Sequence, residues 1–385
     1  MVERLKVQDF EQFGGKHCWT TALKNVFDYH GLHLSEEMLF GLGGGVGFIY
    51  WYMKNMIVPF IGTRLGKTDS LINTCKRIGA EATIFQTNSV KRGHEELKRL
   101  LREGEPAFVF VDMAYLPYLA LPGVAHFGGH TAVVYGLDEQ EDKAYISDCA
   151  EKPVRVSIED LKRARSSKFP PFPPKNKILE IKYPSEIGNL ENGIKEAIRE
   201  CCKNMLKPPM KNIGLAGMQK WADIVPKWPK QFKDLSLYGC LLNTFIYIEV
   251  SGTGGGAFRL MYAQFLRESS SILNEPGLNE TAELFEKSGK VWTEIATTAL
   301  PDYCSLLKKT RELSFEKNRI FREQKQGALE KMRKINIELD GLMKKVAEEL
   351  QKKDLAFLLE NLKYKILECY QIEEKAFKKL YTTIE

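Results

Sequence analysis

One cysteine of the chain, Cys18, has the surroundings that a nucleophilic thiol needs. It follows the pair Gly14-Gly15 and begins the segment 18–30, whose apolar spacing predicts a helix. The unpaired N–H groups and the dipole at the start of a helix favour a thiolate over a thiol. A buried structural thiol is the competing interpretation, and it is the one we adopt for the other cysteines.

A cysteine nucleophile also needs a base, and His130 is the best candidate for that role. It stands at the start of a predicted strand, and Asp148 ends the strand expected to pair with it, so a hairpin should bring the two side chains together. Asp138 and Asp142 compete for the orienting role but have the pattern of solvated turn residues. The order Cys, His, Asp is that of papain-like enzymes, although His130 could instead be a structural histidine.

Three further side chains are candidates for the surroundings of the substrate. Gln12 precedes Cys18 by six positions, and at that spacing a glutamine amide can share an oxyanion hole with the Cys18 N–H. His17 is adjacent to the nucleophile but should point elsewhere once the helix begins, so we expect a pocket residue at most. Tyr50, in the strand-like segment 48–52, is a candidate substrate-binding residue.

Two glycine clusters invite comparison with phosphate-binding loops. Residues 41–47 follow a helix rather than a strand and lack the spacing of a dinucleotide fingerprint, and neither cluster has the lysine of a P-loop. Ordinary turns account for both. For residues 252–256 an alternative is open, because a glycine loop at the start of a helix can bind an anion through its N–H groups. Gly254, Gly255 and Arg259 are the corresponding candidates.

The 385 residues are enough for two domains, and the proline-rich segment 169–178 is the natural linker between them. We predict a catalytic domain at residues 1–168 and a mainly helical domain for substrate or partner binding at residues 179–385. The expected fold class is α+β. The patterns predict helices over 18–30, 69–78, 95–102, 190–206, 256–273, 278–299 and 312–381, a short helix opening at 35, and strands over 48–52, 107–112, 131–136 and 143–148.

Charge and histidine are distributed unevenly between the two parts. Residues 1–170 contain 21 basic and 21 acidic side chains, so the net charge of +6 belongs to the remainder. All six histidines lie at or before residue 130, so the second domain cannot supply an imidazole base. Its basic excess would suit an acidic protein partner or a phosphate, but solvated helix faces explain it equally well.

The composition excludes several classes of protein. With 44% hydrophobic and 28% charged residues, the chain is not a disordered tail, a collagen-like repeat or a disulfide-rich toxin. Its charged N-terminus lacks the apolar core of a secretory signal, and no apolar run reaches the roughly 20 residues of a membrane helix. We expect a cytoplasmic protein with reduced thiols, without a metal or cofactor, that binds neither nucleic acid nor membranes.

A set of longer motifs extends over nearly the whole chain. The segments are HCWTTAL at 17–23, FGLGGG at 40–45, GFIY at 47–50, GHTAVV at 129–134 and SD at 147–148. Together they resemble the N-terminal domain of the butirosin biosynthesis protein H family. The cluster GTGGG at 252–256, with the residues that follow it, is similar to the helical domain of unknown function that commonly comes after that domain.

The resemblance implies a papain-like fold similar to that of the bacteriocin-leader peptidases. In the pathway that names the family, it implies acyl transfer from the phosphopantetheine thioester of an acyl carrier protein to an amine of an aminoglycoside. Cys18 and His130 take the matching catalytic positions, and Asp148 is the third member. Gln12 matches the oxyanion glutamine of the broader papain-like group.

Our leading hypothesis from the sequence is a cysteine-dependent acyltransferase. A cysteine peptidase or amidase, in which water resolves the same acyl-enzyme, is the first alternative, and a catalytically silent binding protein on the same scaffold is the second. We expect an acyl carrier protein or another acyl thioester as donor and a small-molecule amine as acceptor. A phosphopantetheine-linked acyl group would then be a substrate, and a homodimer stays an open alternative.

Overall fold

The computed structural model describes residues 2–54, 56–65, 68–121, 125–352 and 355–385. The chain divides into two compact units, and each is assembled from three separate stretches. The first, which we call the sheet unit, comprises Met1–Leu39, Leu71–Gly188 and Lys317–Asn336. The second, which we call the helical unit, comprises Phe40–Ser70, Asn189–Glu316 and Ile337–Glu385.

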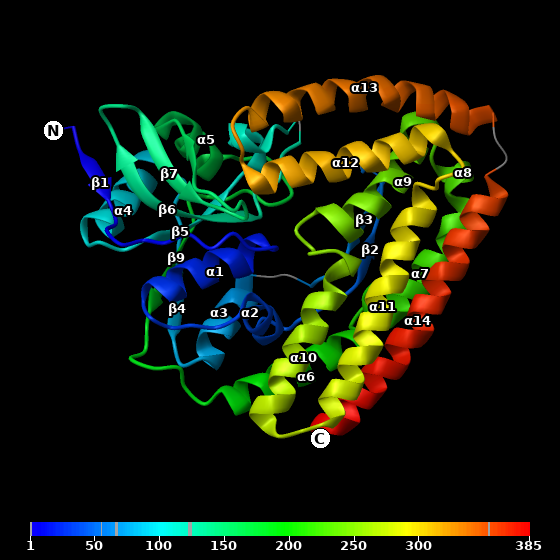
Figure 1. The fold of residues 1–385 in the computed structure, drawn as a ribbon, viewed down its shortest axis with the longest axis horizontal. Coiled ribbons are helices and arrows are strands. Elements are labelled where there is room, and N and C mark those ends of the chain that lie inside the picture. The colour runs from blue at the N-terminus through cyan, green and yellow to red at the C-terminus, as the bar shows by residue number, and fades with distance from the viewer. Residues whose placement is uncertain (1, 55, 66–67, 122–124, 353–354) are drawn as a thin grey trace. The chain divides into compact units, whose positions relative to one another are not determined.

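An antiparallel sheet of seven strands forms the centre of the sheet unit (Figure 1). Its order is β4-β9-β5-β6-β7-β8, and β1 pairs with β6 as well. The central strands β5 and β6 are buried along their whole length, because the helices α1, α4 and α5 pack against them. The strands are β1 (Arg4–Lys6), β4 (Glu81–Phe85), β5 (Ala107–Val111), β6 (His130–Asp138), β7 (Lys143–Ser147), β8 (Val154–Val156) and β9 (Ile178–Lys182).

The hairpin of β6 and β7 brings the start of one strand beside the end of the other. Val133 lies opposite Ser147, and the register shifts by a bulge between Val134 and Gly136. His130 is the first residue of β6 and lies opposite Val111 of β5. The antiparallel pairing expected from the sequence is confirmed, and it delivers residues 130 and 148 to the same end of the sheet.

Among the helices of the sheet unit, α1, α2 and α3 lie close to their predicted positions, whereas α4 and α5 differ from the prediction. α1 (Cys18–Tyr29), α2 (Glu36–Leu42), α3 (Thr68–Arg77), α4 (Val90–Arg102) and α5 (Ile158–Ser166) are its helices, with α2 and α3 each crossing into the helical unit at one end. α4 begins earlier than residue 95, because the Ser89 hydroxyl caps it by accepting from Arg92 N–H. α5 was not predicted, although Ser157 caps it in the same way.

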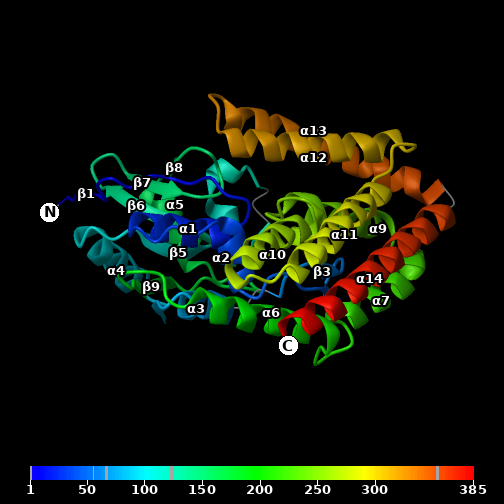
Figure 2. The same ribbon diagram turned by 60° about the horizontal axis from the view of Figure 1, so that its bottom comes forward.

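Long helices make up most of the helical unit, and α10, α11 and α14 pack together along its length (Figure 2). No helix of the described residues combines the length and apolar content needed to cross a bilayer. The helices that lie in or extend into this unit are α6 (Leu190–Leu206), α7 (Gly214–Ile224), α8 (Trp228–Gln231), α9 (Asp234–Phe245), α10 (Arg259–Leu273), α11 (Gly277–Ala299), α12 (Ser305–Glu323), α13 (Ala328–Lys352) and α14 (Ala356–Ile384).

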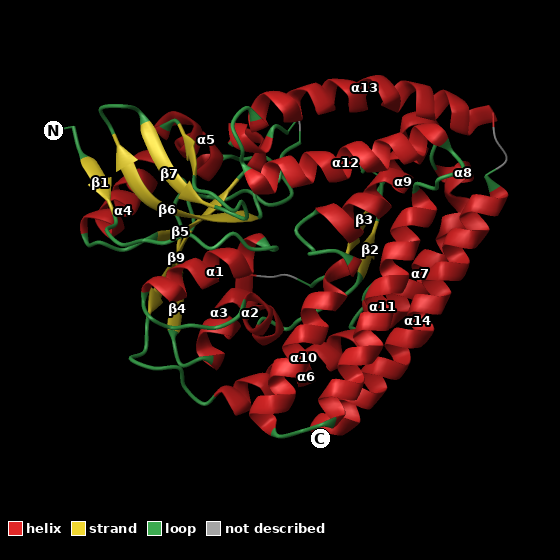
Figure 3. Ribbon diagram, viewed as in Figure 1, coloured by secondary structure: helices red, strands yellow, loops and turns green. Residues whose placement is uncertain are grey.

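The two units do not follow the contiguous division expected from the proline-rich segment. β9 comes after that segment but pairs with β4 and β5, so the sheet continues into the region assigned to the helical domain. Conversely, β2 (Ile49–Trp51) and β3 (Phe60–Gly62) form a hairpin within the helical unit, seen in yellow in Figure 3. Contacts between segments that are distant in the sequence decide which unit each strand belongs to, and the local amino-acid composition does not reveal these contacts.

Candidate active site

Cys18 is the first residue of α1, and a buried carboxylate holds the turn that precedes it. Glu36, at the start of α2, accepts hydrogen bonds at 2.9 Å from the backbone N–H groups of Lys16 and His17. The same carboxylate accepts from the hydroxyls of two threonines inside α1. Glu36 therefore binds the N-cap N–H as the glutamate of a capping box does, while His17 at the N-cap makes no capping hydrogen bond with its own side chain.

The helix that carries Cys18 is tied directly to the strand that carries His130. The indole N–H of Trp19 donates to the carbonyl of Gly129 at 3.0 Å, and Gly129 is the residue before His130. The Cys18 N–H lies in the first turn of α1 and so has no acceptor within the helix. The thiol thus stands beside a backbone donor, on a helix end that is anchored to the β6 strand.

Asp148 is a buried acceptor for three separate groups. Its Oδ2 lies 2.8 Å from His130 Nε2, and the same oxygen accepts from the Tyr118 hydroxyl at 2.8 Å. Its Oδ1 accepts from the backbone N–H of Cys149 at 2.7 Å. Tyr118 comes from the short 3-10 helix Pro117–Leu119, so Asp148 joins that turn, the start of β6 and the end of β7.

The electrostatics of this group favour a charged histidine. Burial opposes the charge on His130, but the charges of Asp148 and Cys18, with a hydrogen bond to each, raise the pKa of His130 well above its usual value. Burial likewise opposes ionisation of Asp148, yet His130, Tyr118 and the Cys149 N–H lower the pKa of Asp148. Since Asp148 occupies Nε2, the other ring nitrogen of His130 is the one left for the Cys18 thiol.

Cys18 differs from the other cysteines in its exposure. It is half-buried, whereas the remaining thiols are all buried and none is in a disulfide. Burial raises the pKa of Cys75, Cys201 and Cys240 to about 12, which keeps these thiols protonated and unreactive at neutral pH. Among the described residues, no group of three His, Cys, Asp or Glu side chains is placed to hold a metal ion.

Gln12 lies against the loop that follows Asp148. Its amide nitrogen donates to the carbonyl of Ala150 at 2.5 Å. Its carbonyl oxygen is buried and has no partner within the described part of the chain. An amide nitrogen carries two hydrogens, so this contact leaves one donor of Gln12 uncommitted.

The two remaining pocket candidates, His17 and Tyr50, belong to different units of the structure. The His17 ring lies 6.4 Å from the Trp19 ring and is half-buried, within the sheet unit near the start of α1. Tyr50 lies instead in the helical unit, where its hydroxyl accepts from the Trp228 indole at 3.3 Å. Burial raises the pKa of Tyr50 to about 12. Its expected contact with substrate is wrong, because the hydroxyl is enclosed in a protein core.

The glycine loop at 252–256 already binds an anionic side chain of its own unit. The Gly256 N–H donates to the Glu249 carboxylate at 3.1 Å, and the Gly255 N–H donates to the Thr253 hydroxyl at 3.1 Å. Gly254 is exposed at the tip of the loop, with a φ of +70°. At the anion site expected here, the N–H groups of Gly255 and Gly256 are therefore already hydrogen-bonded to side chains of the helical unit.

Arg259 is completely buried and is not a ligand-binding residue. Its guanidinium forms a two-pronged ion pair with Glu373, through Nε at 2.7 Å and Nη2 at 3.0 Å. The remaining hydrogens of the guanidinium go to the backbone carbonyls of Gly47, Thr63 and Ala257. All five donors are used, so the sequence prediction of an anion-binding arginine is wrong.

A second histidine–carboxylate pair lies in the loop before His130. Asp112 Oδ2 accepts from the Ser167 hydroxyl at 2.5 Å and lies 2.8 Å from His126 Nδ1. Serine and histidine both bind the carboxylate rather than each other, so this is not a nucleophile–base arrangement. Asp112 also accepts from the Phe127 N–H at 3.0 Å, and it therefore holds the loop that leads into β6.

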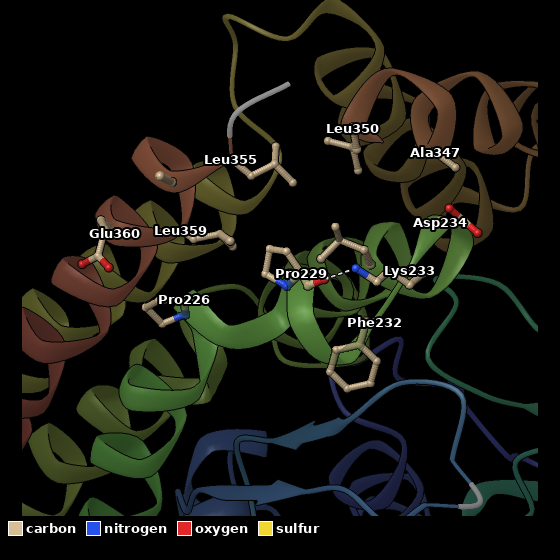
Figure 4. A pocket seen from close by; sticks show the side chains of 12 residues that line it. Pro226, Pro229, Phe232, Lys233, Asp234, Ala347, Leu350, Leu355, Leu359 and Glu360 are labelled. Atoms are coloured by element: carbon tan, nitrogen blue, oxygen red, sulfur yellow. Dashed lines mark hydrogen bonds between the residues drawn. The ribbon is translucent and has the colours of Figure 1, made fainter. Parts of the chain in front are cut away.

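A pocket of about 470 Å³ lies within the helical unit (Figure 4). Apolar side chains from the start of α14, the end of α13 and the segment 226–237 line it together with the carboxylates of Asp234 and Glu360, and the Lys233 ammonium at its wall donates to the Pro229 carbonyl at 2.8 Å. Its lining contains no cysteine or histidine. We therefore place the candidate reaction site at Cys18, His130 and Asp148.

Sequence reasoning missed two residues of the site. Glu36 stands at the start of a predicted short helix, and only its burial and its hydrogen bonds show that it holds the turn before Cys18. Tyr118 lies in an irregular segment without periodicity, and nothing in the sequence connects it with Asp148. Both depend on contacts between segments that are distant along the chain.

Two family models match the chain. Residues 17–149 match the model described as Butirosin biosynthesis protein H, N-terminal, and residues 159–320 match a Domain of unknown function (DUF4872). The first match contains Cys18, His130 and Asp148. No protein with a curated description matches the chain significantly.

The His130–Asp148 pair makes the free energy of unfolding depend on pH. The pKa of His130 is raised on folding, so its contribution is complete below the unfolded-state value of about 6.5 and is lost as pH rises through the raised pKa. The pKa of Asp148 is lowered, so its contribution is complete above about 3.9 and is lost as pH falls through the lowered pKa.

We therefore expect His130→Gln to lower the free energy of unfolding by about 3–5 kcal/mol near pH 6, because Asp148 would stay buried without its cation. Urea unfolding between about pH 4 and pH 10 should show this difference shrinking toward high pH. His33→Gln is the control, since His33 is 75% exposed. A difference that does not change with pH would contradict the assignment.

The Arg259–Glu373 pair should be a main support of the helical unit. Arg259→Met should lower the free energy of unfolding by about 3–5 kcal/mol, because Glu373 would keep a buried charge without a partner. Arg267→Met is the matched control, since the side chains of Arg267 and its partner Glu286 are 36% and 41% exposed and this pair should contribute less than about 1 kcal/mol. Equal losses in urea unfolding would show that Arg259 is not the support inferred here.

Proposed function

The chain belongs to the butirosin biosynthesis protein H family, and on that premise we propose that it is a biosynthetic enzyme with cysteine-dependent acyltransferase activity. The proposal includes a papain-like arrangement of the sheet unit, with Cys18 as nucleophile, His130 as base and Asp148 as the residue that orients it. The observation that supports it most directly is the buried pair of His130 and Asp148 at 2.8 Å, and the charge of Cys18 helps to raise the pKa of this histidine.

In the first half-reaction the Cys18 thiolate attacks the carbonyl carbon of an acyl thioester. A carbon–sulfur bond to Cys18 forms, and negative charge moves to the carbonyl oxygen, where the Cys18 N–H and the uncommitted hydrogen of Gln12 can stabilise it. The bond to the donor's sulfur then breaks, and the leaving thiolate takes the proton of His130. The raised pKa of His130 supports this step, because it keeps the imidazolium available.

In the second half-reaction an amine attacks the acyl-enzyme. His130 accepts the proton of the attacking nitrogen, the bond to Cys18 breaks, and the amide product leaves with the thiolate restored. Asp148 stabilises the charged imidazole and orients it throughout. If water takes the place of the amine, the same residues hydrolyse the acyl-enzyme, which is the outcome that would make the protein a peptidase or amidase.

The substrates proposed follow from the family rather than from a contact in the chain. The donor would be an acyl group on the phosphopantetheine thiol of an acyl carrier protein, and the acceptor a small-molecule amine. Both are compatible with the chemistry of a half-buried thiol, which accepts an acyl group from a thioester without a metal or redox step.

Cys18→Ala should abolish covalent labelling of the protein by a small acyl thioester, because all the other thiols are buried. His130→Gln should slow labelling by about 10²–10⁴-fold. Intact-mass measurement after timed incubation gives both results, with Cys304→Ala as the control in a buried thiol. Labelling that survives in Cys18→Ala would refute the proposal. Wild-type acyl-enzyme mixed with an amine should release amide, and release of free acid alone would identify a hydrolase.

Gln12→Ala should lower the rate of acylation by roughly 10²–10³-fold with little change in KM, as expected for a donor that binds only the transition state. Single-turnover acylation kinetics measure this loss. Gln8→Ala is the control, since Gln8 is exposed in the same segment. Equal rates for the two variants would remove Gln12 from the oxyanion site.

A further inference from the structure

The sheet unit includes a helical hairpin from the distant C-terminal part of the chain. Residues 317–336, which we call the strap, comprise the end of α12 and the start of α13, and they belong to the sheet unit although 128 residues of the helical unit precede them. α12 and α13 run side by side in both Figure 1 and Figure 2. Phe321 of the strap packs against the hydrophobic core around the sheet.

One residue of the strap bridges the two chain segments on either side of the candidate site. The Arg322 guanidinium donates to the Gly15 carbonyl at 2.8 Å, just before Cys18. The Arg322 backbone carbonyl accepts from the Glu151 N–H at 2.8 Å, just after Asp148. The backbone at Gly15 is closely packed, because a Cβ at this position would overlap the Thr21 hydroxyl and the Glu36 carboxylate.

The two arms of the strap also hold the turn that carries Tyr118. The Lys317 ammonium and the Asn336 amide both donate to the Ala120 carbonyl, at 3.0 and 2.5 Å, and Lys317 donates to Asn336 as well at 2.7 Å. Ala120 closes the 3-10 helix in a left-handed conformation, with a φ of +48°. The turn that positions the Tyr118 hydroxyl against Asp148 is therefore clamped from both helices.

From these contacts we infer that the strap aligns the candidate active site and that Arg322 and Asn336 are positioning residues for the reaction of Cys18. The inference rests on the proposed function for its reaction, but the contacts themselves do not. The strap reaches the three segments that carry or support the nucleophile, the base's carboxylate partner and the tyrosine that binds that carboxylate. The C-terminal half of the chain thus takes part in the site without supplying a catalytic group.

The test uses the full chain and a matched pair of arginines on α12. Arg322→Met removes the donor to Gly15, whereas Arg319→Met removes an arginine that is 61% exposed and pairs with Glu323 on the same helix. We expect Arg322→Met to lower the rate of Cys18 acylation by about ten- to a hundredfold with little change in KM, because small displacements of reacting groups carry costs of that size. Arg322→Lys should recover most of the rate.

Hydrogen exchange separates positioning from a general loss of structure. In Arg322→Met the amides of residues 13–17 and of Glu151 should exchange faster, while those of α14 keep their protection; Arg319→Met should change neither. If Arg322→Met does not fold, Asn336→Ala replaces it, with faster exchange expected at residues 118–121. The strap inference would be overturned if the loops of the variant exchanged at the same rate as those of the wild type. It would also be overturned if the rate of acylation fell without faster exchange in these loops. Absence of acylation in the wild type would refute the proposed function instead and leave the exchange test intact.

Discussion

The buried carboxylate of Asp148 accepts the hydrogen bonds that connect the segments of the candidate site. An ionised carboxylate without contact to water is stable only if donors surround it, because the desolvation of the charge otherwise dominates. His130, Tyr118 and the Cys149 N–H supply those donors. The start of β6, the end of β7 and the 3-10 turn are coupled through this one side chain, and each must be in place before the charge can be buried.

The C-terminal half of the chain makes buried polar contacts that hold backbone segments together. Within the helical unit, Arg259 uses every donor on Glu373 and three backbone carbonyls, and so joins α10, α14 and the loops near Gly47 and Thr63. Within the sheet unit, the strap brings the ends of α12 and α13 to the loops around Cys18 and Asp148. All six histidines lie at or before residue 130, and Arg259 and Arg322 downstream of them bind backbone carbonyls.

Local patterns predicted the elements that carry the site, and non-local burial decided where prediction failed. The helix at Cys18 and the β6–β7 hairpin were both evident, because periodicity, capping residues and turn residues act over a few positions. Arg259 and Tyr50 were misinterpreted because an arginine or tyrosine beside a glycine-rich segment looks available for binding. Each proved to be buried, with its polar atoms used by residues far along the chain.

The amino-acid sequence by itself identified the candidate residues, since a thiol at a helix start, a histidine opening a strand and an aspartate ending its partner strand are each visible in local patterns. It also determined an α+β chain with a helical C-terminal region. Only the tertiary structure showed that Glu36, Tyr118 and Arg322 bind the segments that carry those candidates. The physical reason is that their roles come from burial and hydrogen bonding between segments whose separation in sequence bears no relation to their distance in space.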